Sequence, residues 1–134
     1  MALAVLIIGS TPVAARKKTR HRVVMQVSGS DTTEWKGTIN NLKNLKKGWD
    51  SDVAIEVVAH GPGIAFLLTR KTTQGDAIRA LTAQGVQFVI CENSLLEKKV
   101  GKQEVMPEAG LVPMGIGEIA LKQEDGWSHI KSGF

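Results

Sequence analysis

The sequence predicts an α/β protein, a three-layer αβα sandwich built around a small, mostly parallel sheet. Strand-like and helix-like segments alternate four times along the chain, which is typical of parallel strands joined by helical crossovers. The predicted strands are also near-continuous apolar runs, as a sheet covered on both faces requires. A length of 134 residues suits one domain, and a hydrophobic content of 43% with 22% charged residues is ordinary for a globular protein.

The predicted strands are short segments rich in β-branched residues, each of which ends near a glycine, an asparagine or a polar residue. They cover residues 22–28, 53–59, 86–91 and 111–114. Four strands leave two exposed sheet edges, and exposed edges favour association with further copies of the chain.

The predicted helices follow from capping and periodicity. Asp31 is a good N-cap for the first helix, whose apolar stripe is Trp35, Ile39, Leu42, Leu45 and Trp49. Shorter helices are expected at residues 64–68, 76–84 and 93–100. A last helix begins near Gly115 and carries an apolar stripe that extends through Trp127 to Ile130.

The net charge of +4 does not indicate a nucleic-acid-binding protein. Five of the 17 Lys and Arg residues lie within residues 16–22, and the remaining 12 face 13 acidic residues. The body of the protein is therefore close to neutral and offers no concentrated basic surface for a phosphate backbone.

Residues 1–21 are expected to be a signal peptide or basic leader outside the fold, with residues 22–134 forming the single domain. An apolar stretch over residues 2–8 is followed by a breaker and by small residues, the order in which a secretory leader ends. A leader predicts a periplasmic or exported protein. The alternative is an N-terminal strand with a basic linker in a cytoplasmic protein.

A single cysteine excludes an internal disulfide framework and every multi-cysteine metal site within one chain. We expect no metal and no cofactor. No apolar run approaches the roughly 20 residues that a membrane-spanning helix needs.

Chemistry in this fold is expected at the carboxyl ends of the strands, where ligands bind in parallel α/β sheets. Cys91 lies at such a strand-to-helix junction, and helix amides pointing at its sulfur would favour the thiolate. The carboxylate of Glu92 would oppose this, but it can turn away. Buried free cysteines are common, so a packed, inert thiol is the alternative.

Four further residues are candidates for a substrate site. His60 and Gly61 follow the second strand, and Asn93 follows the cysteine. Asn41 falls inside the first helix, where it is a mediocre helix former that can face the crevice or a subunit contact. The segment Gly115-Ile-Gly-Glu-Ile-Ala120 matches a dinucleotide-binding fingerprint, but too few residues follow it to supply the second strand and the ribose-binding acid.

Three blocks of the sequence resemble the DsrE/DsrF-like family. They are Val-Val-Ala-His-Gly-Pro-Gly at 57–63, Gly-Val-Gln-Phe-Val-Ile-Cys-Glu-Asn-Ser-Leu at 85–95 and Gln-Glu-Asp-Gly-Trp-Ser-His-Ile at 123–130. The cysteine block is similar to that of the small stand-alone branch with a Cys-x-Asn-Ser/Thr motif.

The resemblance implies a DsrE-like, sulfur-relay-like fold built into trimers or hexamers, in which Cys91 carries sulfur as a persulfide and Asn93 shapes its loop. The chain is then a sulfur carrier or a sulfurtransferase-like protein. Because it has no second cysteine, a partner protein or a small thiol must supply and remove the sulfur. The alternative is a non-catalytic oligomeric module that binds a small anionic or nucleotide-like ligand.

Overall fold

The computed structural model describes residues 19–133, in which five parallel strands form one sheet. The order across the sheet is β4-β3-β2-β1-β5. The strands are β1 (His21–Val27), β2 (Val53–Ala59), β3 (Gln87–Cys91), β4 (Ala109–Val112) and β5 (Ser128–Lys131).

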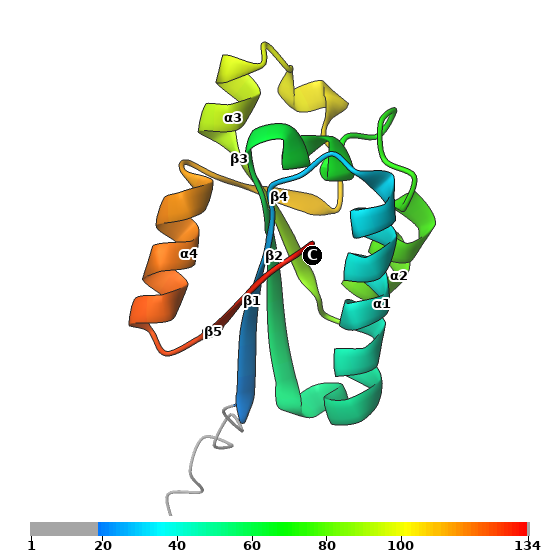
Figure 1. Cartoon of the computed structure of the whole chain (residues 1–134), viewed down its shortest axis with the longest axis vertical. Coiled ribbons are helices and arrows are strands. Elements are labelled where there is room, and N and C mark those ends of the chain that lie inside the picture. Colours follow the sequence, from blue (N-terminus) through cyan, green and yellow to red (C-terminus); the bar gives the residue numbers. More distant parts are fainter. Residues whose placement is uncertain (1–18, 134) are drawn as a thin grey trace, which may run out of the picture.

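Helices cover both faces of this sheet, which confirms the predicted αβα sandwich (Figure 1). One face carries α1 (Thr32–Trp49) and α2 (Gly75–Ala83), and the opposite face carries α4 (Gly115–Glu124). The short helix α3 (Glu92–Glu97) lies beyond the carboxyl ends of the strands. Three 3-10 turns complete the described chain: η1 (Asp50–Asp52), η2 (Gly61–Leu67) and η3 (Lys102–Glu104).

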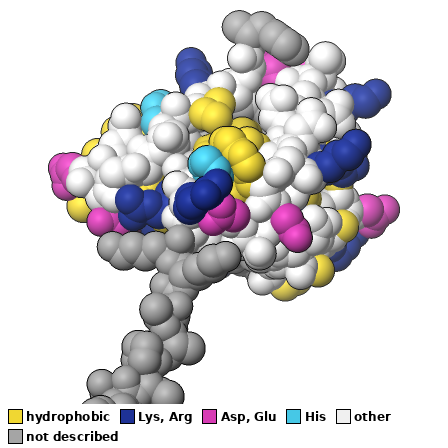
Figure 2. Space-filling model, turned by 90° about the horizontal axis from the view of Figure 1, so that it is seen from below, with side chains coloured by type: hydrophobic (Ala, Val, Ile, Leu, Met, Phe, Trp, Pro, Cys, Tyr) yellow, Lys and Arg dark blue, Asp and Glu magenta, His cyan; other side chains and the backbone are white. Residues whose placement is uncertain are grey.

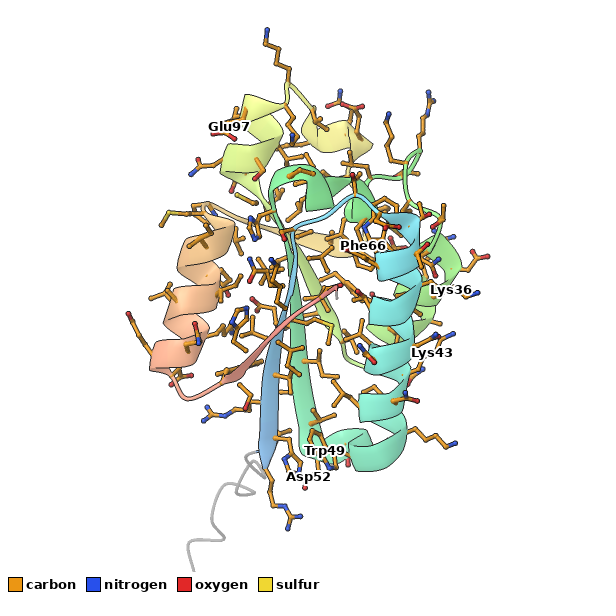
Figure 3. All side chains as sticks on the ribbon, viewed as in Figure 1. Lys36, Lys43, Trp49, Asp52, Phe66 and Glu97 are labelled. Carbon is orange, nitrogen blue, oxygen red and sulfur yellow. The ribbon has the colours of Figure 1, made fainter. Side chains whose placement is uncertain are left out.

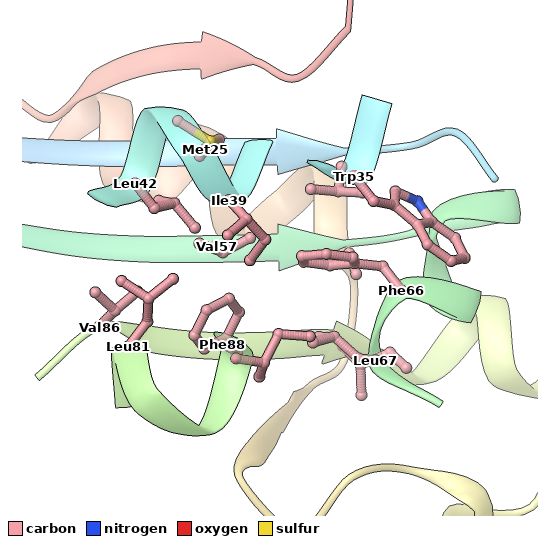
Figure 4. Packing of buried hydrophobic residues seen from close by; sticks show 14 of the residues in the cluster. Met25, Trp35, Ile39, Leu42, Val57, Phe66, Leu67, Leu81, Val86 and Phe88 are labelled. Carbon is pink, nitrogen blue, oxygen red and sulfur yellow. The ribbon is translucent and has the colours of Figure 1, made fainter. Parts of the chain in front are cut away.

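The main hydrophobic core lies between the sheet and the pair α1 and α2. Trp35, Ile39 and Leu42 of α1 pack there against alternate side chains of the strands (Figure 4). The aromatic rings of Phe66 and Phe88 are tilted against each other with their centroids 6.3 Å apart. Burying such side chains supplies most of the free energy that orders the sheet.

Helix α1 forms as its sequence predicts. The Asp31 carboxylate accepts a hydrogen bond of 2.8 Å from the backbone N–H of Thr33 and so caps the helix. Lys36 and Lys43 point away from the sheet on the opposite side of the helix (Figure 3). The exposed Trp49 at the end of the helix stacks on His21, with ring centroids 3.7 Å apart.

The turn after β2 is pressed against the end of β1 at a glycine. A Cβ on Gly63 would lie 2.2 Å from the carbonyl oxygen of Val27, so this close approach requires glycine. The Gly63 N–H donates to the Ser28 carbonyl, 3.1 Å away, and the His60 N–H donates to the Val27 carbonyl, 3.0 Å away. These contacts hold the residues after β2 beside the carboxyl end of β1.

The prediction of four strands, and of a last helix that reaches Ile130, is wrong. Helix α4 ends at Glu124, and Gly126 adopts a left-handed conformation (φ 86°) that reverses the chain. Residues Ser128–Lys131 then pair in parallel with β1 as β5. All four residues of β5 are exposed, so their sequence lacks the apolar run that marks the inner strands.

The other boundaries differ by a few residues. The predicted strand 111–114 is β4, which starts at Ala109, and the predicted helix 64–68 is the 3-10 turn η2. Strand β1 begins at His21, one residue before the predicted strand 22–28, and Arg20 pairs with Asp52 at 2.9 Å. The predicted leader lies mostly outside the described residues.

The end of the molecule where β1 begins carries charges of both signs. Figure 2 views this end and shows Lys or Arg and Asp or Glu side chains interspersed around a small group of hydrophobic side chains. Across residues 19–133, no helix combines the length and the apolar character needed to cross a membrane.

Candidate functional site

Cys91 is the last residue of β3 and the N-cap of α3. Strand alternation turns its side chain toward the α4 side of the sheet, because Val89 faces α4 whereas Ile90 lies in the core under α1 and α2. The residue is only 5% exposed. The predicted strand-to-helix position is therefore present, but the sulfur is covered in the single chain.

Four donor groups surround the Cys91 sulfur. The backbone N–H of Ser94 donates to Sγ at 3.4 Å. The Ser94 hydroxyl and the backbone amides of Gly115 and Asn93 are the other donor groups around the sulfur that favour the thiolate. Burial raises the pKa of the Cys91 thiol, but these four donor groups outweigh burial, so its pKa is lowered. The site thus stabilises a thiolate.

Ser94 is oriented by a second bond. Its side chain is buried, and its Oγ accepts the backbone N–H of Gly61 at 2.8 Å. The hydroxyl proton is then free to point at the sulfur. Gly61 has a positive φ of 55°, so a left-handed turn after β2 presents its N–H to Ser94. Gly61 acts on the cysteine through Ser94.

Gly115 brings the first turn of α4 against the cysteine. A Cβ at this position would lie 2.8 Å from the Cβ of His60 and 3.2 Å from the Cβ of Cys91. Only a glycine lets the helix approach closely enough for its amide to reach the sulfur. The Pro113 carbonyl, just before α4, accepts the Asn93 N–H at 3.3 Å and joins the two helix starts.

The negative charge next to the cysteine is turned away, as the sequence predicts. Glu92 is 3.4 Å from the ammonium group of Lys102 in η3. This pair is partly exposed and contributes little stability, but it directs the carboxylate outward. The hydrogen bonds to the sulfur therefore act with little opposition from Glu92.

His60 lies beside Cys91, at the end of the neighbouring strand. A Cβ on Gly115 would touch the Cβ atoms of both His60 and Cys91. The residues just before them in the two strands, Ala59 and Ile90, are paired in the sheet. The His60 ring is half-buried, and its Nε2 is 2.7 Å from Nε2 of Gln26. Burial lowers the pKa of His60, and the nearby charge of Lys131 lowers it further.

The structure brings some of the predicted site residues together and separates others. Asn93 lies in the site, but its side chain is exposed and its backbone amide makes the contact. Asn41 lies on the α1 side of the sheet, where it lines a cavity of about 450 Å³ with Met25, Trp49 and Ile130. That placement separates Asn41 from the cysteine, because Cys91 faces α4.

Sequence reasoning missed two residues that contact the sulfur, Ser94 and Gly115. Ser94 is the fourth residue of the Cys-x-Asn-Ser motif, so the motif itself contained the signal. Gly115 belongs to the glycine pattern that was set aside as a failed dinucleotide fingerprint. The pattern does mark a close approach of a helix to a strand end, but the group approached is the cysteine.

The described residues hold no group of three or more His, Cys, Asp and Glu side chains arranged to bind a metal ion. The candidate site consists of one thiol, its four donors and a neighbouring histidine. These features define an α/β protein with a parallel sheet and a hydrogen-bonded cysteine at the carboxyl end of an inner strand.

The chain belongs to the DsrE/DsrF-like family, whose sequence model matches residues 21–132. It is also similar to a solved structure from Methanobacterium thermoautotrophicum, that of MTH1491, which is described as a protein of unknown function. The two chains are 32% identical and superimpose with a TM-score of 0.78, over 83% of this chain and 98% of the other. A search of the curated proteins finds no match.

Proposed function

We propose that this protein is a sulfur carrier in which Cys91 accepts sulfane sulfur as a persulfide and passes it on. The observation that carries the proposal is the set of four hydrogen-bond donors on the Cys91 sulfur, which lower the thiol pKa against the effect of burial. Membership of a family associated with sulfur relay supports the same chemistry.

The transfer is a thiolate displacement. The Cys91 thiolate attacks the outer sulfur of a persulfide donor, R–S–SH, and forms the new S–S bond. The S–S bond of the donor breaks, and its electron pair leaves with R–S⁻, which takes up a proton from water. No net oxidant is consumed. In the reverse sense, the thiolate of an acceptor removes the outer sulfur and returns Cys91 as a thiolate.

Release of the sulfur requires a second molecule. The chain has one cysteine, so no internal thiol can attack the persulfide. The acceptor is therefore a partner protein or a small thiol. The same four donors that stabilise the thiolate of Cys91 would also stabilise an ionised persulfide.

Access to the sulfur requires movement in this mechanism. Cys91 is 5% exposed, and the first turn of α4 lies against it at Gly115. We include in the proposal that this turn moves to admit the donor. Met114, just before the turn, is 54% exposed, and exposed segments open locally more easily than buried ones.

The test is intact-mass spectrometry after incubation with a persulfide donor. The wild-type chain should gain about 32 Da, the mass of one sulfur atom, and Cys91→Ser should not. A wild-type chain that gains no sulfur, or a Cys91→Ser chain that still does, would overturn the proposal. Because Cys91 is the only cysteine, any thiol adduct is assigned to it.

The burial of Cys91 favours a second candidate, a non-catalytic oligomeric module in which the thiol is only a packed side chain. The rate of alkylation separates the two. A carrier predicts reaction at neutral pH with an apparent pKa below the ordinary thiol value. A packed thiol predicts reaction only on unfolding, at a rate that follows denaturant concentration.

We further propose that the chain forms a homo-oligomer, a trimer or a hexamer. Exposed apolar side chains lie on β4 and α4 and in the loop between them, namely Leu111, Met114, Ile116 and Leu121. Light scattering of the purified protein tests this assembly. An exported location also remains a proposal, and the mass of the mature N-terminus tests it.

A further inference from the structure

A glutamine joins two histidines beside the candidate site. Nε2 of His129 in β5 is 2.8 Å from Oε1 of Gln26 in β1, and Nε2 of Gln26 is 2.7 Å from Nε2 of His60. The three side chains form one hydrogen-bonded row from the exposed edge of the sheet to the neighbour of Cys91.

The amide of Gln26 has one donor end and one acceptor end, and this fixes the protons of both rings. Its NH₂ group donates to Nε2 of His60, so that nitrogen carries no proton and the ring of His60 is neutral with its proton on Nδ1. Its oxygen accepts from Nε2 of His129, which donates in both the neutral and the charged ring.

The surroundings favour this orientation of the amide over the reverse. His60 is half-buried and its charged form is opposed by Lys131, whereas His129 is exposed to water. The carboxylates on the same side of the sheet are directed to another partner, since Glu56 and Glu118 both lie within 4 Å of the Lys122 ammonium. The Gln26 oxygen therefore faces the exposed ring of His129, and the Gln26 NH₂ group faces the half-buried ring of His60.

We infer that Gln26, oriented by His129, holds His60 as the neutral Nδ1–H tautomer beside Cys91, and that Gln26 and His129 are positioning residues for His60. The role at the thiol rests on the proposed function, but the tautomer does not. A neutral His60 adds no cation to the site, so the thiolate is stabilised by its four donors and not by an imidazolium.

The tautomer can be observed directly by long-range ¹H–¹⁵N correlation NMR of the imidazole rings in the full chain. The protein has three histidines, and a His60→Gln variant assigns the signal of interest. The expected result at pH 7 is a neutral His60 with the proton on Nδ1. A neutral ring protonated on Nε2, or an imidazolium, would overturn the inference.

Two variants test the positioning role. Gln26→Glu replaces the donor by a second acceptor, so the pKa of His60 should rise by about one unit or more, and the pH profile of Cys91 alkylation should gain a second step. His129→Ala, at an exposed position, frees the amide to turn, so the pKa of His60 should rise by less. His21→Gln, at the other end of β1, is the control and should change neither profile.

The outcomes separate this inference from the proposed function. Failure of sulfur uptake with the expected tautomer would overturn the carrier and leave the row of Gln26 and the two histidines intact. Sulfur uptake with a His60 titration that neither variant alters would support the carrier and overturn the positioning role.

Discussion

The two faces of the sheet are built differently. The face under α1 and α2 is a continuous apolar layer that includes Trp35, Phe66 and Phe88. Among residues 19–133, the buried apolar cluster of the face under α4 is Val24, Val58 and Ile119, with Glu56, Gln26, His60 and Cys91 on the same side. One face supplies the stability of the fold, and the other holds groups whose protonation state matters.

Burying polar groups on the face under α4 lowers the stability of the fold. The Glu56 side chain is buried, and one of its oxygens, Oε1, has no hydrogen-bond partner. Helix α4 also approaches the sheet through a glycine, and several of its apolar side chains are exposed. The comparison teaches that a fold with one strongly packed face can accommodate buried polar and ionisable groups on the other.

Matched isoleucines test the comparison most strongly. Ile39→Ala in α1 removes a side chain from the large cluster and should lower the free energy of unfolding by about 3–5 kcal/mol. Ile119→Ala in α4 should cost about 2 kcal/mol, because fewer groups surround the cavity that it leaves. Urea denaturation measures both values. Equal losses would show that the two faces are packed alike.

Glu56 should make the stability of the protein depend on pH. Burial, followed by the neighbouring Glu118 carboxyl, raises the pKa of Glu56 from 4.5 to about 7, although Lys122 opposes this. The unfolded chain therefore releases this proton at lower pH than the folded one. The contribution of Glu56 is fully present below pH 4.5 and is lost as pH rises through about 7.

The resulting loss of stability is roughly 2–3 kcal/mol between pH 5 and pH 8. Glu56→Gln should remove most of this dependence, whereas Glu124→Gln, at an exposed position of α4, should leave it unchanged. Thermal denaturation at a series of pH values measures the difference. A Glu56→Gln chain with the same pH dependence as wild type would contradict the burial of a protonated carboxyl.

Two glycines of α4 should respond oppositely to alanine. Gly115→Ala places a Cβ against the Cβ atoms of His60 and Cys91, so it should cost roughly 1–2 kcal/mol and raise the thiol pKa by moving an amide away. At Gly117, the Cβ would meet only the flexible end of Met114, so Gly117→Ala should be neutral or stabilise by up to about 1 kcal/mol. Denaturation and alkylation of each variant would reveal any departure from this order.

Removal of the Ser94 hydroxyl should have a specific effect on the thiol. Ser94→Ala deletes one of the four donors to the sulfur and leaves the Gly61 N–H without its acceptor. The Cys91 pKa should rise by about half a unit to one unit, which slows alkylation at pH 7 several-fold. Ser30→Ala, an exposed serine, is the control, and an unchanged pKa in Ser94→Ala would remove the hydroxyl from the site.

Local signals in the sequence were sufficient for the inner elements. The predicted strand 53–59 has the bounds of β2, and Asp31 caps α1 as expected. Both depend on neighbours within a few residues, namely an apolar run and a side-chain bond to the next turn. The same kind of signal placed Cys91 at the end of β3 and on the edge of the sheet where chemistry was expected.

Elements and contacts that depend on partners far away in the sequence could not be predicted from local sequence patterns. Strand β5 has four exposed residues, and its conformation comes from pairing with β1, about 100 residues earlier in the chain. Trp127 and Ile130 are spaced as on one face of a helix, and this spacing led to the wrong prediction that the last helix reaches Ile130. Asn41 was predicted for the site, but the turn of α1 and the sheet between them separate it from the cysteine.

The sequence by itself determined the class of fold, the inner strands and the cysteine as the candidate nucleophile, because burial on both faces and helix capping are encoded in short windows of residues. Tertiary structure alone decided the burial of the sulfur, the amide that Gly115 brings to it and the row of two histidines around Gln26. Each of these joins groups that are far apart in the sequence, and only the parallel register of the sheet and the packing of α4 against it bring such groups together.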